Sequence, residues 1–145
     1  MVVFRMHGVA LDAFDTVGSF LQPGRWHLAG AHVIYAAQHA SLAVLETLIH
    51  AGGRKMPLRA ITRIHIPDDL SVESAPWISM PDSQVFGDGW LREARTAVLR
   101  VPSIAVNRME SNFVLNPRHE EFSRIRSDRP EEFVFDPRFF ALLPS

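Results

Sequence analysis

The chain has 145 residues, 47% of them hydrophobic and 21% charged, so it is long enough to bury one sizeable core. Its net charge of −1 gives no reason to expect nucleic acid as the main ligand, and the absence of cysteine excludes disulfides, thiolate metal sites and cysteine nucleophiles. No apolar run is long enough to span a bilayer, and the first residues resemble no export signal. We therefore expect a single domain over residues 1–145 that works in the cytoplasm, without direct contact to nucleic acid or membrane.

The first third of the chain predicts two strands and a short helix. Residues 2–6 are typical of a short strand, and residues 32–37 form an apolar run typical of a buried strand. Residues 11–22 are ambiguous and fit a short helix that ends before Pro23.

The strongest helix pattern covers residues 39–53 and ends in a pair of glycines. We expect Ser41 to cap its N-terminus. Leu42, Leu45 and Ile49 recur at helical spacing, so we expect them to form the buried stripe of this helix.

The rest of the chain predicts a strand, a long loop, a second helix and three short strands. Residues 67–89 are rich in proline, aspartate, serine and glycine, which favours a loop; they hold five acidic and no basic side chains. This stretch is either a solvated acidic loop or a surface for a basic partner. The expected elements are a strand at 58–66, a helix at 90–100, and strands at 103–106, 112–115 and 133–135. Five or six strands with two good helices indicate a mixed α+β domain.

Glu46 is the most unusual single residue, because it stands among apolar neighbours within the predicted helix. Such a glutamate either faces water on an amphipathic helix or is buried for a functional reason, and the pattern alone leaves both open. His50 lies one turn further on the same face, either as a simple helix-face contact or as a partner that orients the carboxylate.

Three more side chains are candidates for the same site. Arg25 follows Pro-Gly in a turn, where a guanidinium either binds phosphate through forked hydrogen bonds or is simply an exposed loop residue. Tyr35 is either a ligand contact or a packed strand residue with a satisfied hydroxyl. Ser103 follows a proline, which is also common in turns. A cation, an aromatic ring and a carboxylate brought together could hold a dinucleotide and stabilise a sugar cation.

Other known kinds of site find no support in the sequence. The seven histidines lack the spacing of a zinc site, so we expect no metal. Neither a P-loop nor the glycine-rich fingerprint of a Rossmann domain is present, so a bound dinucleotide would be held in another way. Taken alone, Trp26 is more often a core or lid residue, and Asn112 is more often a turn or strand-end residue.

The segment PGRWHLAGAHVIYAAQHASLAVLETLIH resembles the signature block of RES-domain toxins, which have a Gly-Arg-Trp-Asn turn, a Val-Tyr strand and an Ala-x-x-Glu helix. VPSIAVNRMESNFVLNP and FVFDPRFF resemble later family segments, so the similarity runs from about residue 4 to 140. The Arg, Glu and Ser that name the family match Arg25, Glu46 and Ser103, and its strand tyrosine matches Tyr35. His27 departs from the pattern, because asparagine is usual there.

The resemblance implies a fold similar to ADP-ribosyltransferases, with a split β core, flanking helices and a cleft for NAD⁺. It implies the toxin of a bacterial RES–Xre toxin–antitoxin pair that cleaves the nicotinamide–ribose bond by hydrolysis or phosphorolysis, or alternatively an ADP-ribosyltransferase that modifies a host protein. NAD⁺ would be a substrate, with no permanently bound cofactor. The expected partner is a helical Xre-like antitoxin that blocks the cleft, with a toxin homodimer in the complex.

The resemblance also implies a role for each matched residue. Glu46 would stabilise an oxocarbenium-like ribose, Arg25 would hold the pyrophosphate or the neighbouring ribose, and Tyr35 would stack on nicotinamide. Ser103 would orient Glu46 or the ribose. We place four further residues at the NAD⁺ surface: Trp26, Ser41, His50 and Asn112. A non-catalytic module that keeps the cleft only as a docking surface is the remaining alternative.

Overall fold

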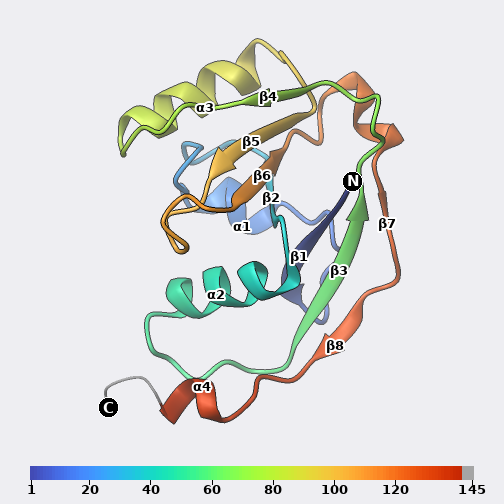
Figure 1. Ribbon diagram of the computed structural model, residues 1–145. Coiled ribbons are helices and arrows are strands. Elements are labelled where there is room, and N and C mark those ends of the chain that lie inside the picture. Colours follow the sequence, from blue (N-terminus) through green and yellow to red (C-terminus); the bar gives the residue numbers. More distant parts are fainter. Residues whose placement is uncertain (142–145) are drawn as a thin grey trace.

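A computed structural model of the protein describes residues 1–141, which fold around one sheet (Figure 1). The strands are β1 (Val2–Gly8), β2 (Ile34–Ala37), β3 (Arg59–His65), β4 (Val72–Ser74), β5 (Val98–Pro102), β6 (Ser111–Leu115), β7 (Arg126–Ser127) and β8 (Glu131–Phe133). The helices are α1 (Val17–Leu21), α2 (Ala40–Ala51), α3 (Asp82–Arg92) and α4 (Arg138–Ala141), with a 3₁₀ turn at Glu120–Arg124. This arrangement confirms the expected α+β class. Within the described residues, no helix combines the length and the apolar character needed to cross a bilayer.

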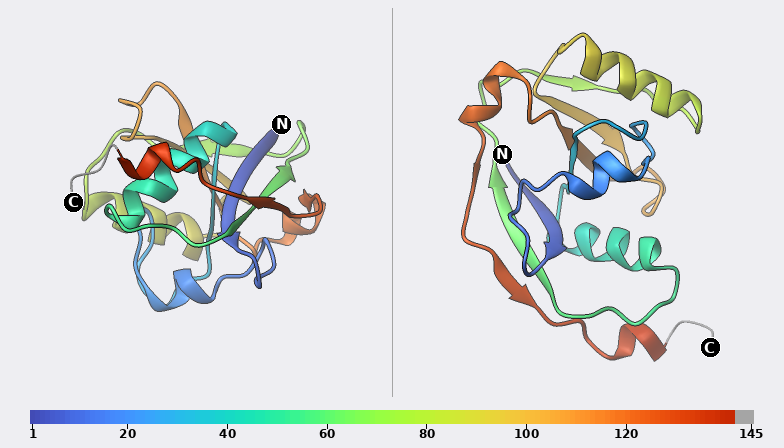
Figure 2. Two further views of the ribbon diagram at one scale, coloured as in Figure 1. Left: turned by 90° about the horizontal axis from the view of Figure 1, so that it is seen from below. Right: turned by 180° about the vertical axis from the view of Figure 1, so that it is seen from behind.

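The sheet has two halves that meet at a narrow contact. Its strand order is β4-β5-β6-β2-β1-β3-β7, and β8 also pairs with β3. Only β4 and β5 run parallel; the other pairs are antiparallel. β1 and β2 share a single register pair, Phe4 with Ala37, whereas β1 and β3 pair along their whole length. The sheet therefore opens between β2 and β1, which part from one another in the right-hand view of Figure 2.

The side chain of Arg5 occupies the place where β1 and β2 diverge. Its two terminal nitrogens donate to the carbonyl oxygens of Tyr35 and Asp15, each at 3.1 Å. Burial lowers the pKa of Arg5 to about 10, although Asp15 opposes the shift. Arg5 thus supplies side-chain donors to two backbone carbonyls at the point where β1 and β2 part, one from β2 and one from the loop before α1.

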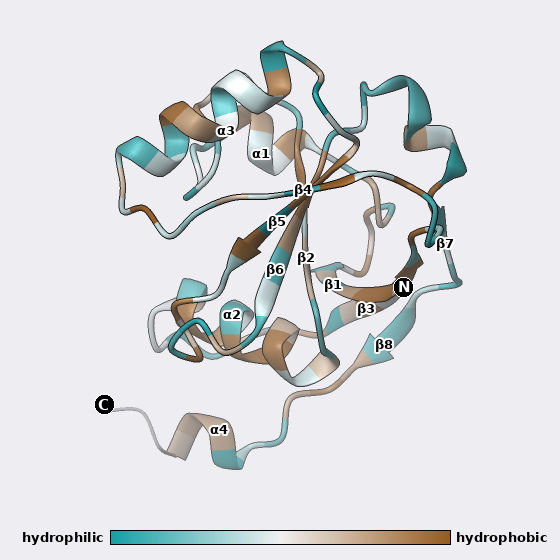
Figure 3. Ribbon diagram, turned by 45° about the horizontal axis from the view of Figure 1, so that its top comes forward, coloured by the Kyte–Doolittle hydropathy of each residue, from teal (hydrophilic) through white to brown (hydrophobic). Residues whose placement is uncertain are grey.

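The core is continuous on one face of the sheet and divided on the other. One face carries a cluster that includes Val3, Ile34, Ile64 and Phe113. The opposite face carries two clusters: one around Trp26 and Trp90 under α3, and one around Ala37, Leu42 and Ala43 under α2. Figure 3 shows mostly hydrophobic residues along β1 and β5, whereas hydrophobic and hydrophilic residues alternate around α3. The division leaves a border between α3 and α2 on which polar side chains can gather.

Helix α2 lies where the sequence predicts it, but two details of the prediction are wrong. His39, rather than Ser41, occupies the N-cap position, and its side chain makes no capping hydrogen bond. Leu42 is buried as expected, whereas Leu45 and Ile49 are 39% and 61% exposed. The helix instead packs through Leu42 and the small Ala43, which allows a close approach to the sheet.

The region between residues 67 and 106 differs most from the prediction. The expected loop contains β4 and all but the end of α3, and the expected helix at 90–100 is the end of α3 followed by β5. Ala94 adopts a left-handed conformation with φ of 49°, two residues beyond the last residue of α3. Residues 103–106 belong to the turn of the β5–β6 hairpin, in which Asn107 and Arg108 are also left-handed. The predicted strand at 133–135 overlaps β8 only at Phe133.

Gly87 of α3 provides a test of this packing. A Cβ atom at this position would lie 1.7 Å from the carbonyl oxygen of Trp26. We expect Gly87→Ala to lower the free energy of unfolding by about 1–3 kcal/mol, because the backbone of one element must move away from the other. Denaturant titration measures the change. Gly18→Ala is the control, because its added Cβ meets no atom within 4 Å apart from its chain neighbours and the backbone of its own helix; a loss of stability equal to that of Gly87→Ala would contradict the tight packing at Gly87.

Candidate functional site

The carboxylate of Glu46 lies where α2 meets the β5–β6 hairpin. Ser103 Oγ donates to Glu46 Oε1 at 2.7 Å, and Asn112 Nδ2 donates to the same oxygen at 2.8 Å. Glu46 is half-buried, and Ser103 is only 1% exposed. Among residues 1–141, no side chain or backbone group donates to the other oxygen, Oε2. One oxygen is therefore held by the protein while the second is left for a ligand.

Local structure holds each of these three residues in place. Glu46 stands four residues after Leu42 and three after Ala43, so it shares the buried side of α2. Ser103 follows β5 directly: its N–H donates to the Glu110 carbonyl at 3.0 Å, and its own carbonyl accepts from Arg108 N–H at 2.7 Å. Asn112 pairs in register with Ala37 of β2. The contact between Glu46 and Ser103 thus joins segments 57 residues apart.

A second group forms around the hydroxyl of Tyr35. Nε2 of His27 lies 2.9 Å from the carbonyl oxygens of both Ser19 and Gln22, so this nitrogen carries a hydrogen. Nδ1 of the same ring shares a hydrogen bond with the Tyr35 hydroxyl at 2.7 Å. The same hydroxyl oxygen accepts from the Trp26 N–H at 3.1 Å. Tyr35 and His27 together therefore hold the turn that carries Arg25.

The environment keeps the Tyr35 phenol neutral. Burial raises the pKa of Tyr35 well above its usual value, while the hydrogen bond with Trp26 and the positive charge of Arg25 partly oppose this shift. Arg25 directly precedes Trp26, whose N–H donates to the Tyr35 hydroxyl, so its backbone lies next to this group. Arg25 itself is exposed, and within residues 1–141 its guanidinium has neither a hydrogen bond nor an ion pair. The structure therefore presents an uncommitted cation beside a neutral ring.

Of the other predicted site residues, Trp26 and Asn112 belong to these two groups, whereas Ser41 and His50 do not. Trp26 is 2% exposed and packs in the core edge-on to Phe86, so its ring supports the turn from within. Its indole Nε1 is buried without a partner among the described residues. Ser41 and His50 are exposed on α2, and His50 makes no hydrogen bond to Glu46. Asn112 is expected at the substrate surface, which stays a prediction; the structure shows that its amide donates to Glu46.

Two contacts of the site could not be found by motif reasoning. His27 stands out in the sequence only as a departure from the usual asparagine, with no sign that its partner is Tyr35. Ser83 and Gln84 of α3 bind the backbone of the Arg25 turn, but they lie in a stretch whose composition favours a loop. Ser83 and Arg25 are 58 residues apart, and His27 and Tyr35 lie on a turn and a strand, so helix or strand periodicity contains no signal for either contact.

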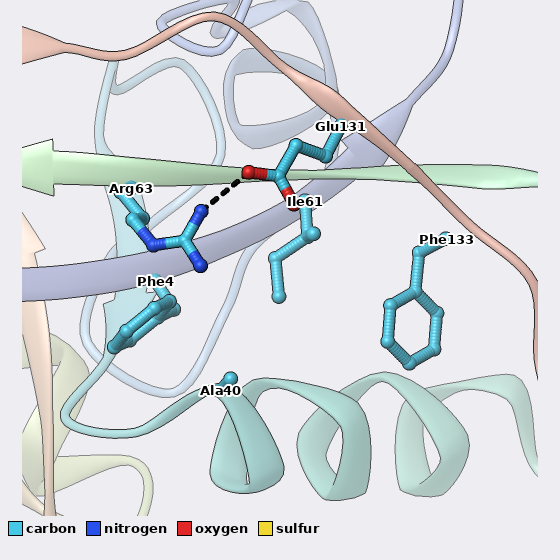
Figure 4. Close-up of a pocket in the computed structure, with 6 residues that line it drawn as sticks. All are labelled: Phe4, Ala40, Ile61, Arg63, Glu131 and Phe133. Carbon is cyan, nitrogen blue, oxygen red and sulfur yellow. Dashed lines mark hydrogen bonds and ion pairs between the residues drawn. The ribbon is translucent and has the colours of Figure 1, made fainter.

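Two shallow pockets on the surface of residues 1–141 lie away from Glu46. One of them lies between β1, β3, β8 and the first residue of α2, and Figure 4 shows Arg63 reaching across it to Glu131 at 2.5 Å, beside Phe4 and Ile61. Another lies between the segment after α2 and the chain leading to α4. Neither contains the carboxylate or Arg25, so the chemistry of the side chains, rather than the depth of the surface, identifies the candidate site.

Tyr35 is the only tyrosine of the chain, which makes its ionisation directly observable. Because burial raises its pKa, we expect ultraviolet absorbance to show no tyrosinate in the folded protein at pH values where the denatured protein titrates, near 10. The unfolded state then loses its proton first, so Tyr35 leaves stability unchanged below about pH 10 and lowers it above. Coincident titration of the folded and denatured protein would contradict the hydrogen-bonded, buried hydroxyl.

The sequence matches the model of the RES domain over residues 2–136. It is 34% identical to "Prs ADP-ribosylating toxin" of a Sphingobium species, an alignment that covers 88% of this chain and 86% of that protein. It is also similar to proteins named "Toxin Res": 36% identical to that of Yersinia enterocolitica, covering 95% of this chain and 99% of the relative, and 32% identical to that of Pseudomonas putida, covering 97% and 100%.

A solved structure with a similar fold is the M. tuberculosis MbcT-MbcA toxin-antitoxin complex. The match has a TM-score of 0.71, covers 97% of this chain and 86% of the other, and has 15% sequence identity. At this identity the likeness concerns the fold alone. The family model and the relatives nevertheless agree with it along nearly the whole chain: the protein belongs to the RES domain family.

Proposed function

We propose that this protein is the toxin of a toxin–antitoxin pair and that it consumes NAD⁺ by cleaving the bond between nicotinamide and ribose. The observation that carries the proposal is the Glu46 carboxylate, with Oε1 fixed by Ser103 and Asn112 and Oε2 without a partner in residues 1–141. The names of the relatives and of the structural neighbour support the toxin role.

The charge changes during this reaction explain why a carboxylate is needed. Nicotinamide is part of a cationic ring in NAD⁺ and leaves with the bonding electron pair as a neutral base, so no strong general acid is required. Positive charge builds up on the ribose, as in glycoside cleavage. Glu46 stabilises this charge by electrostatic attraction, and an acceptor then forms the new bond to the anomeric carbon and loses its proton. A preorganised group of this kind contributes about 3–4 kcal/mol to lowering the barrier.

Arg25 and Tyr35 would act on other parts of the substrate. The exposed guanidinium of Arg25 suits a phosphate oxygen or a ribose hydroxyl, because it is not committed to any carboxylate among the described residues. Tyr35 has its hydroxyl tied to His27 and Trp26, so only its ring is offered to nicotinamide, by stacking.

Transfer of ADP-ribose to a protein is the second candidate reaction. The specific support for it is the name of the Sphingobium relative, "Prs ADP-ribosylating toxin". Hydrolysis, phosphorolysis and transfer share the cleavage step at Glu46 and differ only in the acceptor: water, phosphate or a side chain. We further propose that a helical Xre-like antitoxin covers the cleft, that the toxin is a homodimer in this complex, and that both act in the cytoplasm.

Glu46→Gln tests the role of the carboxylate. The amide oxygen of glutamine can accept the same hydrogen bonds from Ser103 and Asn112, so the fold should be retained while the negative charge is lost. We expect the rate of nicotinamide release to fall by about 10²–10³-fold, measured by chromatography of the free base.

A second charge-removing variant serves as the control. Glu110→Gln removes the carboxylate that pairs with His39 at 2.9 Å, next to the same hairpin, and we expect nicotinamide release within about twofold of the native rate, since an exposed pair contributes little. Equal release by the native protein and Glu46→Gln would exclude Glu46 as the catalytic carboxylate.

The products distinguish the acceptors. With purified protein and NAD⁺, we expect nicotinamide together with ADP-ribose in phosphate-free buffer or its 1-phosphate when phosphate is the acceptor, both identified by mass spectrometry. Addition of cell extract tests transfer, because an acceptor protein would gain the mass of ADP-ribose. No nicotinamide under any of these conditions, with a folded protein, would contradict the proposed reaction.

A further inference from the structure

We propose that the first turns of α3 position Arg25, and that Ser83 and Gln84 are positioning residues for the reaction. This inference rests on the proposed function, in which Arg25 holds the substrate. Helix α3 follows β4 and lies over the turn that carries Arg25, at residues 24–27 (Figure 1).

Two side chains of α3 bind the backbone of this turn directly. Ser83 Oγ donates to the carbonyl oxygen of Arg25 at 2.6 Å, and Ser83 is completely buried. Gln84 Nε2 donates to the carbonyl oxygen of Gly24 at 2.8 Å. These contacts fix two successive peptide groups, and a donor lost from a buried site leaves its carbonyl without a partner.

Two glycines allow the helix, the turn and Tyr35 to approach closely. Gly87, one turn after Ser83, lies against the Trp26 carbonyl so tightly that no Cβ fits. A Cβ on Gly24 would lie 2.7 Å from both Tyr35 Oη and His27 Cε1. Both positions therefore exclude side chains because the backbone is squeezed between neighbours.

The opposite side of the turn is held by the Tyr35 hydroxyl on Trp26 N–H, and the turn closes on itself through Gly24 N–H and the His27 carbonyl at 3.2 Å. The backbone from Gly24 to Trp26 is thus fixed from α3 and from β2, while the Arg25 side chain is left free of partners within residues 1–141. A fixed backbone with a free guanidinium is the arrangement that reduces the entropy lost when a ligand is bound.

Core packing alone does not explain the two polar contacts. Trp90 and Phe86 already attach α3 to the hydrophobic cluster around Trp26. Ser83 and Gln84 instead reach the main chain of the residue that carries the guanidinium and of its neighbour. If they served only stability, their loss would affect the whole protein and would not depend on the side chain at position 25.

The test compares Ser83→Ala and Gln84→Met with Arg25→Ala. For both α3 variants we expect the KM for NAD⁺ to rise about tenfold with kcat within about twofold, because the lost contact weakens binding of the ground state and transition state alike. In the Arg25→Ala background, the same substitutions should cause no further rise. If Ser83→Ala fails to fold, Gln84→Met carries the test, because Gln84 is only half-buried.

The matched control removes a hydrogen bond elsewhere on α3. Thr96→Val deletes the hydroxyl that accepts from Trp90 Nε1 at 2.9 Å and donates to the Val98 carbonyl. We expect it to lower thermal stability and leave KM unchanged. An equal rise of KM in this control, or a further rise when an α3 variant is added to Arg25→Ala, would overturn the positioning role.

A measurement without substrate separates this inference from the proposed function. If the native protein releases no nicotinamide, the proposed reaction fails, and amide hydrogen exchange of the free protein still tests the turn. We expect Ser83→Ala and Gln84→Met to accelerate exchange of the Trp26 and Gly24 amides about tenfold, with exchange of the β1–β3 amides unchanged. Unchanged exchange at both turn amides would overturn the inference.

Discussion

The carboxylate of Glu46 accepts its hydrogen bonds from neutral side chains, and the rest of the site depends on this arrangement. A serine hydroxyl and an asparagine amide orient the carboxylate without neutralising it, whereas a lysine or arginine partner would already satisfy its charge. Among residues 1–141, no basic side chain forms an ion pair with Glu46. In the reaction that we propose, the carboxylate would therefore be oriented before positive charge develops on the ribose, and no basic side chain among the described residues would compete with that charge.

The place of this carboxylate follows from the division of the core. Apolar side chains gather under α3 and under α2 in separate clusters, so the border between them is the part of this sheet face where polar groups lose least by desolvation. β1 and β2 share a single register pair, and beside it Arg5 donates to the backbone carbonyls of Tyr35 and Asp15. Tyr35, whose carbonyl accepts from Arg5, also binds the Trp26 N–H through its hydroxyl, so this opening of the sheet adjoins the half of the site that carries Arg25.

Local patterns predicted the elements whose residues alternate or recur strongly, such as α2 and the β3 strand, and the family motifs predicted Glu46, Ser103 and Arg25 as a set. The local patterns failed for α3, because its eleven residues include two glycines and two aspartates and have weak helix propensity. That helix exists because Gly87 fits against Trp26 and Trp90 is buried, which are tertiary contacts. They failed also for Leu45 and Ile49, since periodicity identifies an apolar stripe but not the neighbour that covers it.

The two halves of the site are aligned by the ladder between β2 and β6. Tyr35, which anchors the Arg25 turn, and Ala37 point to the same face because they are two residues apart in a strand. Asn112 of β6 pairs in register with Ala37 of β2, so its side chain lies on the same face as Tyr35. The donor to Glu46 is therefore opposite the residue that follows Tyr35 on this face. A shift of the ladder by one residue would send either Tyr35 or Asn112 to the opposite face. The hydrophobic residues that alternate with them, Ile34, Ala36 and Phe113, oppose such a shift, because it would move them out of the continuous core. The relative positions of Tyr35 and Asn112 are therefore set by strand register, which the core itself specifies.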